Sequence, residues 1–228
     1  MADISEFEKK IEISFSDKEL LRRAFTHRSY INEVGGERKH NERLEFLGDA
    51  VLELVITHFL FDKYPDTPEG ELTAVRAALV NTQSIAQAAR ELGMNEYLLL
   101  SRGEERDTGR ARHFILANTY EAVIGAIYLD QGYDAAHRFI QQTLFHKAKA
   151  IVENKTWHDP KSRFQELAQE HESITPTYKV LKEEGPDHDK HFTIGIFLEE
   201  EQVAQGEGQS KQEAEQEAAK NALEERGW

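Results

Sequence analysis

Apolar residues recur at helical spacing through the first 150 residues of the chain. The clearest run covers 44–61, where the apolar positions follow a period near 3.6 and so share one face of a helix. They are positions 44, 47, 51, 54, 55 and 59. The same pattern predicts further helices over 17–30, 71–81, 83–92, 115–129 and 134–151, the first with Asp17 as its N-cap. No segment here alternates with period two, so we expect an all-α domain.

The pattern changes after a polar stretch at 154–159. Residues 161–171 form a predicted helix, whereas 177–181 and 192–198 alternate with period two and are predicted strands. Gly185-Pro186-Asp187 is the predicted turn between these strands, and 202–205 is a candidate third strand before a last helix that begins at Ser210. The order α-β-β-β-α predicts a small α+β domain.

These patterns divide the chain into two expected domains. We expect a helical domain over 3–132, with helices continuing to about 150. A linker over 151–158 follows, because its composition is polar and Pro160 comes soon after it. The α+β domain then covers 159–228.

The charge of the chain argues against a generic nucleic-acid binder. The sequence has 42 acidic and 28 basic residues, a net charge of −14. Residues 1–150 hold 24 acidic and 19 basic residues, and residues 151–228 hold 18 acidic and 9 basic residues. Neither part has the excess of basic residues that is typical of a nucleic-acid-binding domain. Any interaction with RNA must therefore rest on local groups of residues.

Composition and targeting signals narrow the class of protein further. The chain has no cysteine, so neither disulfides nor thiolate metal sites hold the fold. Its first residues are acidic and lack the apolar core of a signal peptide. The longest apolar stretch, around 50–61, is broken by polar residues and is too short to cross a bilayer. We therefore expect a cytoplasmic protein without membrane contact.

Three carboxylates near the start of the 44–61 run suggest a metal site. Glu42, Glu45 and Asp49 are spaced i, i+3 and i+7, so they project from one helix face, where like charges repel unless a cation binds between them. Gly48 costs the same helix about 1 kcal/mol relative to Ala. We interpret it as a place where a polymer approaches closely. The alternative, a solvated acidic face, fits Asp49 poorly because its neighbours are apolar.

A second acidic position lies in the almost wholly apolar segment 114–129. Asn118 and Glu121 are i, i+3 neighbours on one face of this predicted helix. A carboxylate in such surroundings is rarely left unpaired. Pairing with Arg43 or Arg76 is one explanation. The one we favour is that Glu121 faces the first three carboxylates across a helix bundle.

Residues 41–52, Asn-Glu-Arg-Leu-Glu-Phe-Leu-Gly-Asp-Ala-Val-Leu, resemble the signature of the ribonuclease III family nearly residue for residue. Residues 26–29, 68–70 and 115–125 resemble further landmarks of this family, and the resemblance covers essentially the whole chain. It implies that Glu45, Asn118 and Glu121 are metal ligands and that Asp49 and Glu121 are the catalytic pair. Many members carry Asp where this chain has Asn118, which implies a weakened or retuned metal site.

The resemblance also implies an activity. It implies a Mg²⁺-dependent endoribonuclease, with Mn²⁺ as a substitute, that makes staggered cuts in double-stranded RNA and leaves 5′-phosphate and 3′-hydroxyl ends. Two active sites, and hence a homodimer, follow from a staggered cut. Glu42 and Glu69 match acidic positions that line the cleavage valley. Phe46 matches an aromatic residue that enters a socket of the partner subunit, although plain core packing is an alternative. Ribosomal RNA precursors and other structured transcripts are the implied substrates.

The second domain resembles a double-stranded-RNA-binding domain, which implies three contact regions. The first helix offers side chains to one minor groove, and His188 lies in a loop that could enter the next. The start of the last helix could hold phosphates through Ser210 and Lys211. The residues of the first helix are Lys161, Arg163, Gln165 and Glu166.

Each RNA contact has a simpler explanation. Ser210 and Glu213 have the spacing of a capping box, which needs no RNA. His188 could simply be solvated. Gln212 stands where the family has a second basic residue, so we expect weak phosphate binding.

Two functions from other classes stay open. A protein of the same fold could bind duplex RNA without cutting it, and Asn118 and the acidic second domain favour this function. An acidic protein-interaction module would explain the charge, but it leaves Glu121 and the 41–52 signature without a purpose.

Overall fold

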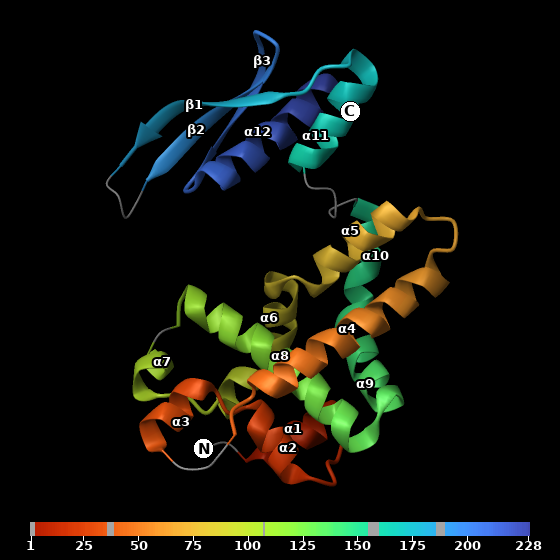
Figure 1. Ribbon diagram of the computed structural model, residues 1–228, viewed down its shortest axis with the longest axis vertical. Helices are drawn as coiled ribbons and strands as arrows, with labels where there is room; N and C mark the ends of the chain where they lie inside the picture. The colour runs from red at the N-terminus through yellow and green to blue at the C-terminus, as the bar shows by residue number, and fades with distance from the viewer. Residues whose placement is uncertain (1–2, 36–38, 107, 155–159, 186–189) are drawn as a thin grey trace. The chain divides into compact units, whose positions relative to one another are not determined.

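The computed structural model describes residues 3–35, 39–106, 108–154, 160–185 and 190–228 (Figure 1). The chain divides into two compact units, Met1–Trp157 and His158–Trp228. Among the described helices, none has both the length and the apolar character that crossing a membrane requires.

The first unit is helical, as the periodicity predicts. An isolated bridge between Thr26 and Leu99 is the only strand-type pairing among its described residues. The helices are α1 (Ile4–Ile11), α2 (Lys18–Ala24), α3 (Arg28–Val34), α4 (Glu42–Lys63), α5 (Glu69–Val80), α6 (Thr82–Glu91), η1 (Met94–Tyr97), α7 (Arg102–Arg106), α8 (Arg110–Gln131), α9 (Tyr133–Ile140), the π-helical turn η2 (Gln141–Phe145) and α10 (His146–Asn154).

The prediction of one helix over 17–30 is wrong, because the chain forms two. Asp17 does cap α2, since its side chain accepts a hydrogen bond from the backbone of Glu19. The backbone then straightens at Thr26 to pair with Leu99 and to accept a hydrogen bond from the N–H of Asn41 at 2.9 Å. These contacts with distant residues prevail over the local preference for a continuous helix.

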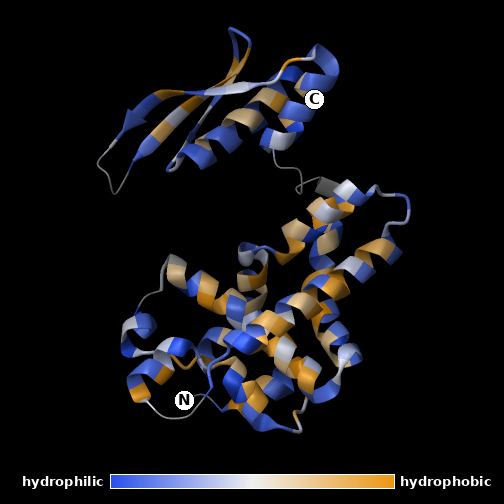
Figure 2. Cartoon of the chain, viewed as in Figure 1, coloured by the Kyte–Doolittle hydropathy of each residue, from blue (hydrophilic) through white to orange (hydrophobic). Residues whose placement is uncertain are grey.

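α4 and α8, the two longest helices, cross at the centre of the unit, and Figure 2 shows apolar residues recurring along both. Their backbones touch at two glycines. A Cβ atom at Gly48 would lie 1.7 Å from the carbonyl oxygen of Glu121, and one at Gly125 would lie 2.2 Å from that of Leu44. This close packing fixes the helix face that carries the acidic residues of α4 against the face of α8 that carries Glu121.

The second unit has the predicted α-β-β-β-α order. Its elements are α11 (Pro160–Glu172), β1 (Thr177–Glu184), β2 (His191–Leu198), β3 (Glu201–Gly208) and α12 (Lys211–Arg226). The sheet is antiparallel in the order β1-β2-β3. The third strand covers Glu201–Gly208 and is therefore longer than the predicted 202–205. Its core joins Phe164 of α11, Ile196 and Leu198 of β2, and alanines of α12. Residues 186–187 of the predicted turn and 155–158 of the predicted linker lie outside the described residues.

Candidate functional site

α4 presents three different faces. One is buried against the rest of the unit and includes Leu44 and Gly48. Next to it, Glu42, Glu45 and Asp49 form an acidic face, with Glu45 half-buried and the other two exposed. The third face is apolar and exposed. We call the acidic face together with Asn118 and Glu121 of α8 the acidic cluster.

Electrostatics show that the members of the acidic cluster lie close together. Burial, and then the charges of Asp49 and Glu45, raise the pKa of Glu121 to about 8. Burial and the charges of Glu42 and Asp49 raise the pKa of Glu45, while a hydrogen bond from the Asn118 side chain lowers it. The structure thus brings together the five positions predicted on the two helices.

Glu121 does not pair with either arginine that the sequence suggests. Among the described residues, no cation contributes to the pKa of Glu121. Arg76 instead donates a hydrogen bond to Thr57 at 3.0 Å and lies 3.6 Å from a carboxylate oxygen of Glu53. The carboxylate of Glu121 therefore lies in a half-buried position among like charges, an arrangement that a bound cation would stabilise.

The interpretation of Gly48 as an approach point for a polymer is wrong. Gly48 is buried, and its missing side chain makes room for the backbone of Glu121. The glycine is therefore required by helix packing. Its effect on the site is indirect, because it lets Glu121 approach the carboxylates of α4.

Glu42 differs from the other members because an arginine and a histidine lie beside its carboxylate. A guanidinium nitrogen of Arg28 lies 3.4 Å from one of its oxygens, and Nδ1 of His40 lies 3.7 Å from the other. Glu42 therefore lies at the edge of the acidic cluster, where part of its charge is balanced.

The side chains of the acidic cluster are suited to a hard divalent cation, but they are not already arranged around one. Within the described ranges, no three His, Asp or Glu side chains converge closely enough to hold a metal ion. Burial, and then like charges, raise the pKa values of Glu45 and Glu121, so bringing their carboxylates closer together without a cation would cost free energy. The donor set of carboxylate and amide oxygens matches Mg²⁺ and Mn²⁺.

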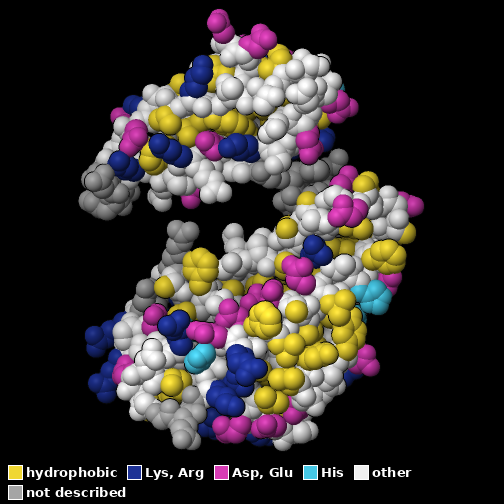
Figure 3. Space-filling view, viewed as in Figure 1, with side chains coloured by type: hydrophobic (Ala, Val, Ile, Leu, Met, Phe, Trp, Pro, Cys, Tyr) yellow, Lys and Arg dark blue, Asp and Glu magenta, His cyan; other side chains and the backbone are white. Residues whose placement is uncertain are grey.

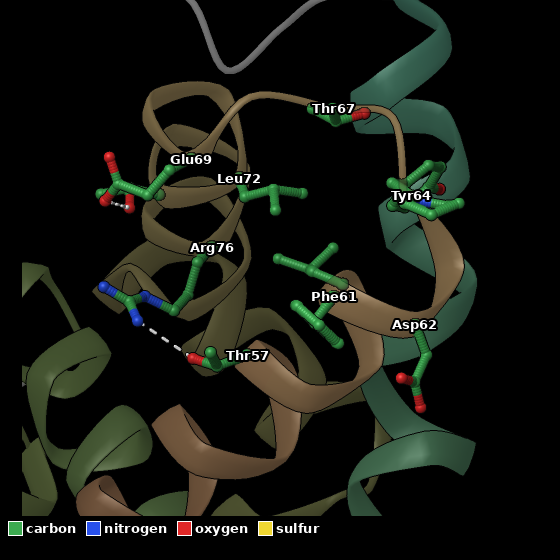
Figure 4. A pocket seen from close by; sticks show the side chains of 11 residues that line it. Thr57, Phe61, Asp62, Tyr64, Thr67, Glu69, Leu72 and Arg76 are labelled. Atoms are coloured by element: carbon green, nitrogen blue, oxygen red, sulfur yellow. Dashed lines mark hydrogen bonds between the residues drawn. The ribbon is translucent and has the colours of Figure 1, made fainter.

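Glu69 lies apart from the acidic cluster in this chain. It is at the start of α5, where its carboxylate accepts a hydrogen bond from Thr73 at 3.2 Å. It does not contribute to the pKa values of Glu45 or Glu121. Instead it lines a cavity of about 650 Å³ between α4 and α5, which Figure 4 shows with Thr57, Phe61 and Arg76.

Phe46 is 82% exposed, so the explanation by core packing is wrong. Leu54 and Phe61 are 57% and 69% exposed, and with the exposed Ala50 they continue the same side of α4. We call these four residues the α4 apolar row. The space-filling view in Figure 3 shows hydrophobic side chains gathered on this unit next to acidic ones. The sequence analysis placed Leu54 on the same helix face as Leu44 and did not single out Phe61, although 46, 50, 54 and 61 also have helical spacing.

The predicted RNA-contact residues of the second unit are in different situations. Gln165 and Glu166 are exposed and line a shallow hollow on α11, while Arg163 is half-buried. Lys161 is held within the unit, because its Nζ lies 2.6 Å from a carboxylate oxygen of Glu215 and 4.6 Å from the ring centre of Tyr178.

At the start of α12, Lys211 is exposed and its Nζ lies 5.7 Å from the ring centre of Phe192. Ser210 caps the helix by accepting a hydrogen bond from the backbone N–H of Glu213, as a capping box predicts. The Glu213 carboxylate in turn accepts from the N–H of Gln209 at 3.0 Å. His188 lies outside the described residues.

Both units match known families. A Ribonuclease-III-like family model matches residues 17–148, and a double-stranded RNA binding motif model matches 160–226. The Ribonuclease 3 of a Nitratiruptor species is 45% identical over 98% of this chain and 96% of the relative. The Ribonuclease 3 of Geobacillus thermodenitrificans is 48% identical over 98% of this chain and 91% of the relative.

A solved structure agrees with these sequence matches. The nuclease domain of ribonuclease III from Campylobacter jejuni is 41% identical, with a TM-score of 0.56, over 62% of this chain and 98% of that domain. That structure concerns flexibility in a region involved in dimer formation. A family model that matches more than half of the chain, together with relatives similar over nearly their whole length, shows that the chain belongs to the ribonuclease III family.

Proposed function

We propose that the protein is an endoribonuclease that hydrolyses double-stranded RNA at the acidic cluster. The observation that carries this proposal is the half-buried carboxylate of Glu121, whose pKa rises to about 8 because of burial and then because of the charges of Asp49 and Glu45, with no cation among the described residues to offset them. Clusters of this kind cost stability and occur at functional sites. Membership of the ribonuclease III family and the match to a double-stranded RNA binding motif support the same activity.

Magnesium, with manganese as a substitute, is the cofactor that the acidic cluster fits. Glu45, Asn118 and Glu121 would hold it through their side-chain oxygens. A divalent cation bound there lowers the pKa of a coordinated water and stabilises the departing 3′ oxygen. Asp49 is exposed and its charge acts on Glu45, and we propose that its carboxylate orients the attacking water and accepts its proton. Glu121 must release its own proton before it can act as a ligand.

A homodimer is the assembly that the α4 apolar row supports. Exposed apolar residues in one continuous row are typical of an interface. The middle of the row lies near Leu54, so a two-fold axis there would run the two α4 helices antiparallel and bring Phe46 of one subunit near Phe61 of the other. Phe61 lines the cavity between α4 and α5, which would then be the socket for Phe46.

Two acidic clusters in one dimer would cut both strands of a duplex. We therefore propose a staggered cut that leaves 5′-phosphate and 3′-hydroxyl ends. We also propose that Glu69 is a further acidic residue that lines the cleavage valley. Ribosomal RNA precursors and other structured transcripts are the proposed substrates. The second unit would bind the duplex through residues of α11 and the start of α12, namely the half-buried Arg163 and the exposed Gln165, Glu166, Ser210 and Lys211.

The experiment that tests the activity uses long end-labelled duplex RNA, with Mg²⁺ or with EDTA. We expect staggered cleavage with Mg²⁺ only, and its loss in Glu121→Ala while RNA binding persists. Glu96→Ala, a change of an exposed glutamate outside the acidic cluster, is the matched control and should cut normally. The second candidate function is RNA binding without cleavage, which Asn118 favours because it removes one charge from the metal site. Binding without cleavage at any Mg²⁺ or Mn²⁺ concentration would establish that function instead.

A further inference from the structure

Tyr120 is a buried polar residue on the helix that carries Asn118 and Glu121, and the proposed chemistry does not use it. It is fully buried, and its hydroxyl oxygen lies 2.5 Å from Oγ1 of Thr143. Thr143 belongs to the π-helical turn η2, and its own hydroxyl donates to the carbonyl oxygen of Phe139 at 2.7 Å. Since a threonine hydroxyl has one proton, Tyr120 is the donor in its bond with Thr143.

The π-helical turn is what places Thr143 there. A turn of this kind is rare and occurs mostly as a single insertion in an α-helix, often at functional sites. Here it separates α9 from α10, and the Thr143 hydroxyl also lies 3.4 Å from the carbonyl oxygen of Ile140. The ring of Tyr120 packs on Phe139 with the ring centres 5.4 Å apart. The hydrogen bond between Tyr120 and Thr143 thus ties α8 to the turn, and the bond from Thr143 to Phe139 anchors the threonine within its own helix.

The bond between Tyr120 and Thr143 lies on the side of α8 away from the metal ligands. Asn118 and Glu121 share the face toward α4, where the backbone of Glu121 meets Gly48. Close packing of α8 on α4 already opposes sliding and rotation of the helix. A hydrogen bond adds a directional restraint against both. α8 is therefore held on one side by contact of its backbone with α4 and on the other by a directional polar link.

We propose that Tyr120 and Thr143 are positioning residues that set the register of α8, and through it the place of the Glu121 and Asn118 oxygens in the metal site. This inference rests on the proposed function, because it assumes that the acidic cluster binds a divalent cation. The two residues touch neither the cation nor the RNA. They act by limiting how far α8 moves when the repelling carboxylates draw together around the ion.

Mn²⁺ binding to the intact protein without RNA, followed by calorimetry, tests the inference. We expect Tyr120→Phe and Thr143→Val each to raise the Mn²⁺ dissociation constant about threefold to tenfold, which is roughly 0.7 to 1.4 kcal/mol. The double variant should be no weaker than either single one, because both remove the same link. Thr143→Ser keeps the hydroxyl and should bind like the wild type. Tyr128→Phe, on the same helix but partly exposed, is the matched control.

The outcomes separate this inference from the proposed function. Weaker binding in Tyr120→Phe and Thr143→Val, with rescue in Thr143→Ser, supports the positioning role. Unchanged Mn²⁺ affinity in both variants, with only a lower melting temperature, overturns it and leaves the metal site intact. A wild-type protein that binds no Mn²⁺ overturns the proposed function and this inference with it. Circular dichroism of each variant shows that a loss of affinity is not a loss of fold.

Discussion

At the scale of single residues, the carboxyl group of Glu121 links stability to pH. Its pKa rises from 4.5 to about 8 in the folded protein because of burial and the charges of Asp49 and Glu45. The folded protein then holds a proton that the unfolded chain has released, so the free energy of unfolding falls as the pH rises from about 4.5 to about 8. The upper limit of this loss is about 1.4 kcal/mol for each pH unit, and solvent at the partly exposed carboxyl reduces it.

Urea unfolding in EDTA at pH 5, 6.5 and 8 measures this effect. Glu121→Gln carries no charge at any of these values, so its stability should fall less with pH than that of the wild type. Of these three pH values, added Mg²⁺ should stabilise the wild type most at pH 8, where the largest fraction of Glu121 is ionised and free to bind. Parallel pH profiles for the two proteins in EDTA would contradict the raised pKa.

Asn118 determines how much charge faces the cation. Replacing it by Asp adds a carboxylate, so Asn118→Asp should lower the Mg²⁺ concentration for half-maximal cleavage by up to about tenfold, or roughly 1.4 kcal/mol. The gain should be largest above pH 8, because a further negative charge also raises the pKa of Glu121. Cleavage rates against Mg²⁺ concentration give the result, with Asn118→Ala as the control that removes the oxygen. An unchanged Mg²⁺ requirement in both variants means that the side chain at 118 is no ligand.

Residue types and their spacing predicted the members of the acidic cluster, because carboxylates at i, i+3 and i+7 must share a helix face. Sequence reasoning failed where the partner was distant along the chain. Gly48 received a functional interpretation because its neighbour in space, the carbonyl group of Glu121, lies on another helix. Lys161 seemed available for RNA, but Glu215, 54 residues later, holds it at 2.6 Å.

At the scale of elements, hydrophobic periodicity predicted the long helices and the α-β-β-β-α order of the second unit. Each element buries one face, so its apolar residues recur with the period of a helix or of a strand. Periodicity missed the division at Thr26, which a bridge to Leu99 causes. It also missed α1, although Phe7 and Ile11 are buried one turn apart and Asp3 caps the helix. Short helices have weak periodicity, so their positions depend on tertiary contacts that no local pattern contains.

The apolar row of α4 leads to a prediction about assembly. Phe46→Asp should convert a dimer into monomers, because each buried Phe side chain contributes about 1.5–3 kcal/mol and a two-fold interface contains it twice. The dissociation constant should therefore rise by at least about a hundredfold. Sedimentation equilibrium measures it. Val180→Asp, a change at an exposed apolar residue of the second unit, should leave the dimer intact. A wild-type protein that is monomeric at all concentrations would exclude the proposed interface.

At the scale of the whole molecule, the unusual property is acidity in a protein that is proposed to bind a polyanion. The second unit is expected to bind the duplex, yet residues 151–228 hold twice as many acidic as basic residues. Cations at the predicted contact positions are few, and Lys161 is already paired with Glu215. Within the described residues, Arg163 and Lys211 form no ion pair, so they are the side chains available for phosphates.

Binding of duplex RNA should therefore depend only weakly on salt. Each phosphate neutralised contributes slightly less than one unit to the slope of log affinity against log salt, so two cations in each of two subunits give a slope of about −3 to −4, against about −10 for a strongly basic binder. Titrations of the inactive Glu121→Gln protein between low and high KCl measure this slope.

Arg163→Ala and Lys211→Ala should each reduce the slope by about one unit for every phosphate that is no longer neutralised. Lys161→Ala should leave the slope unchanged and lower only the melting temperature, because its charge is neutralised by Glu215. A slope near −10, or one that falls in Lys161→Ala, would show that cations held within the unit are released to bind RNA.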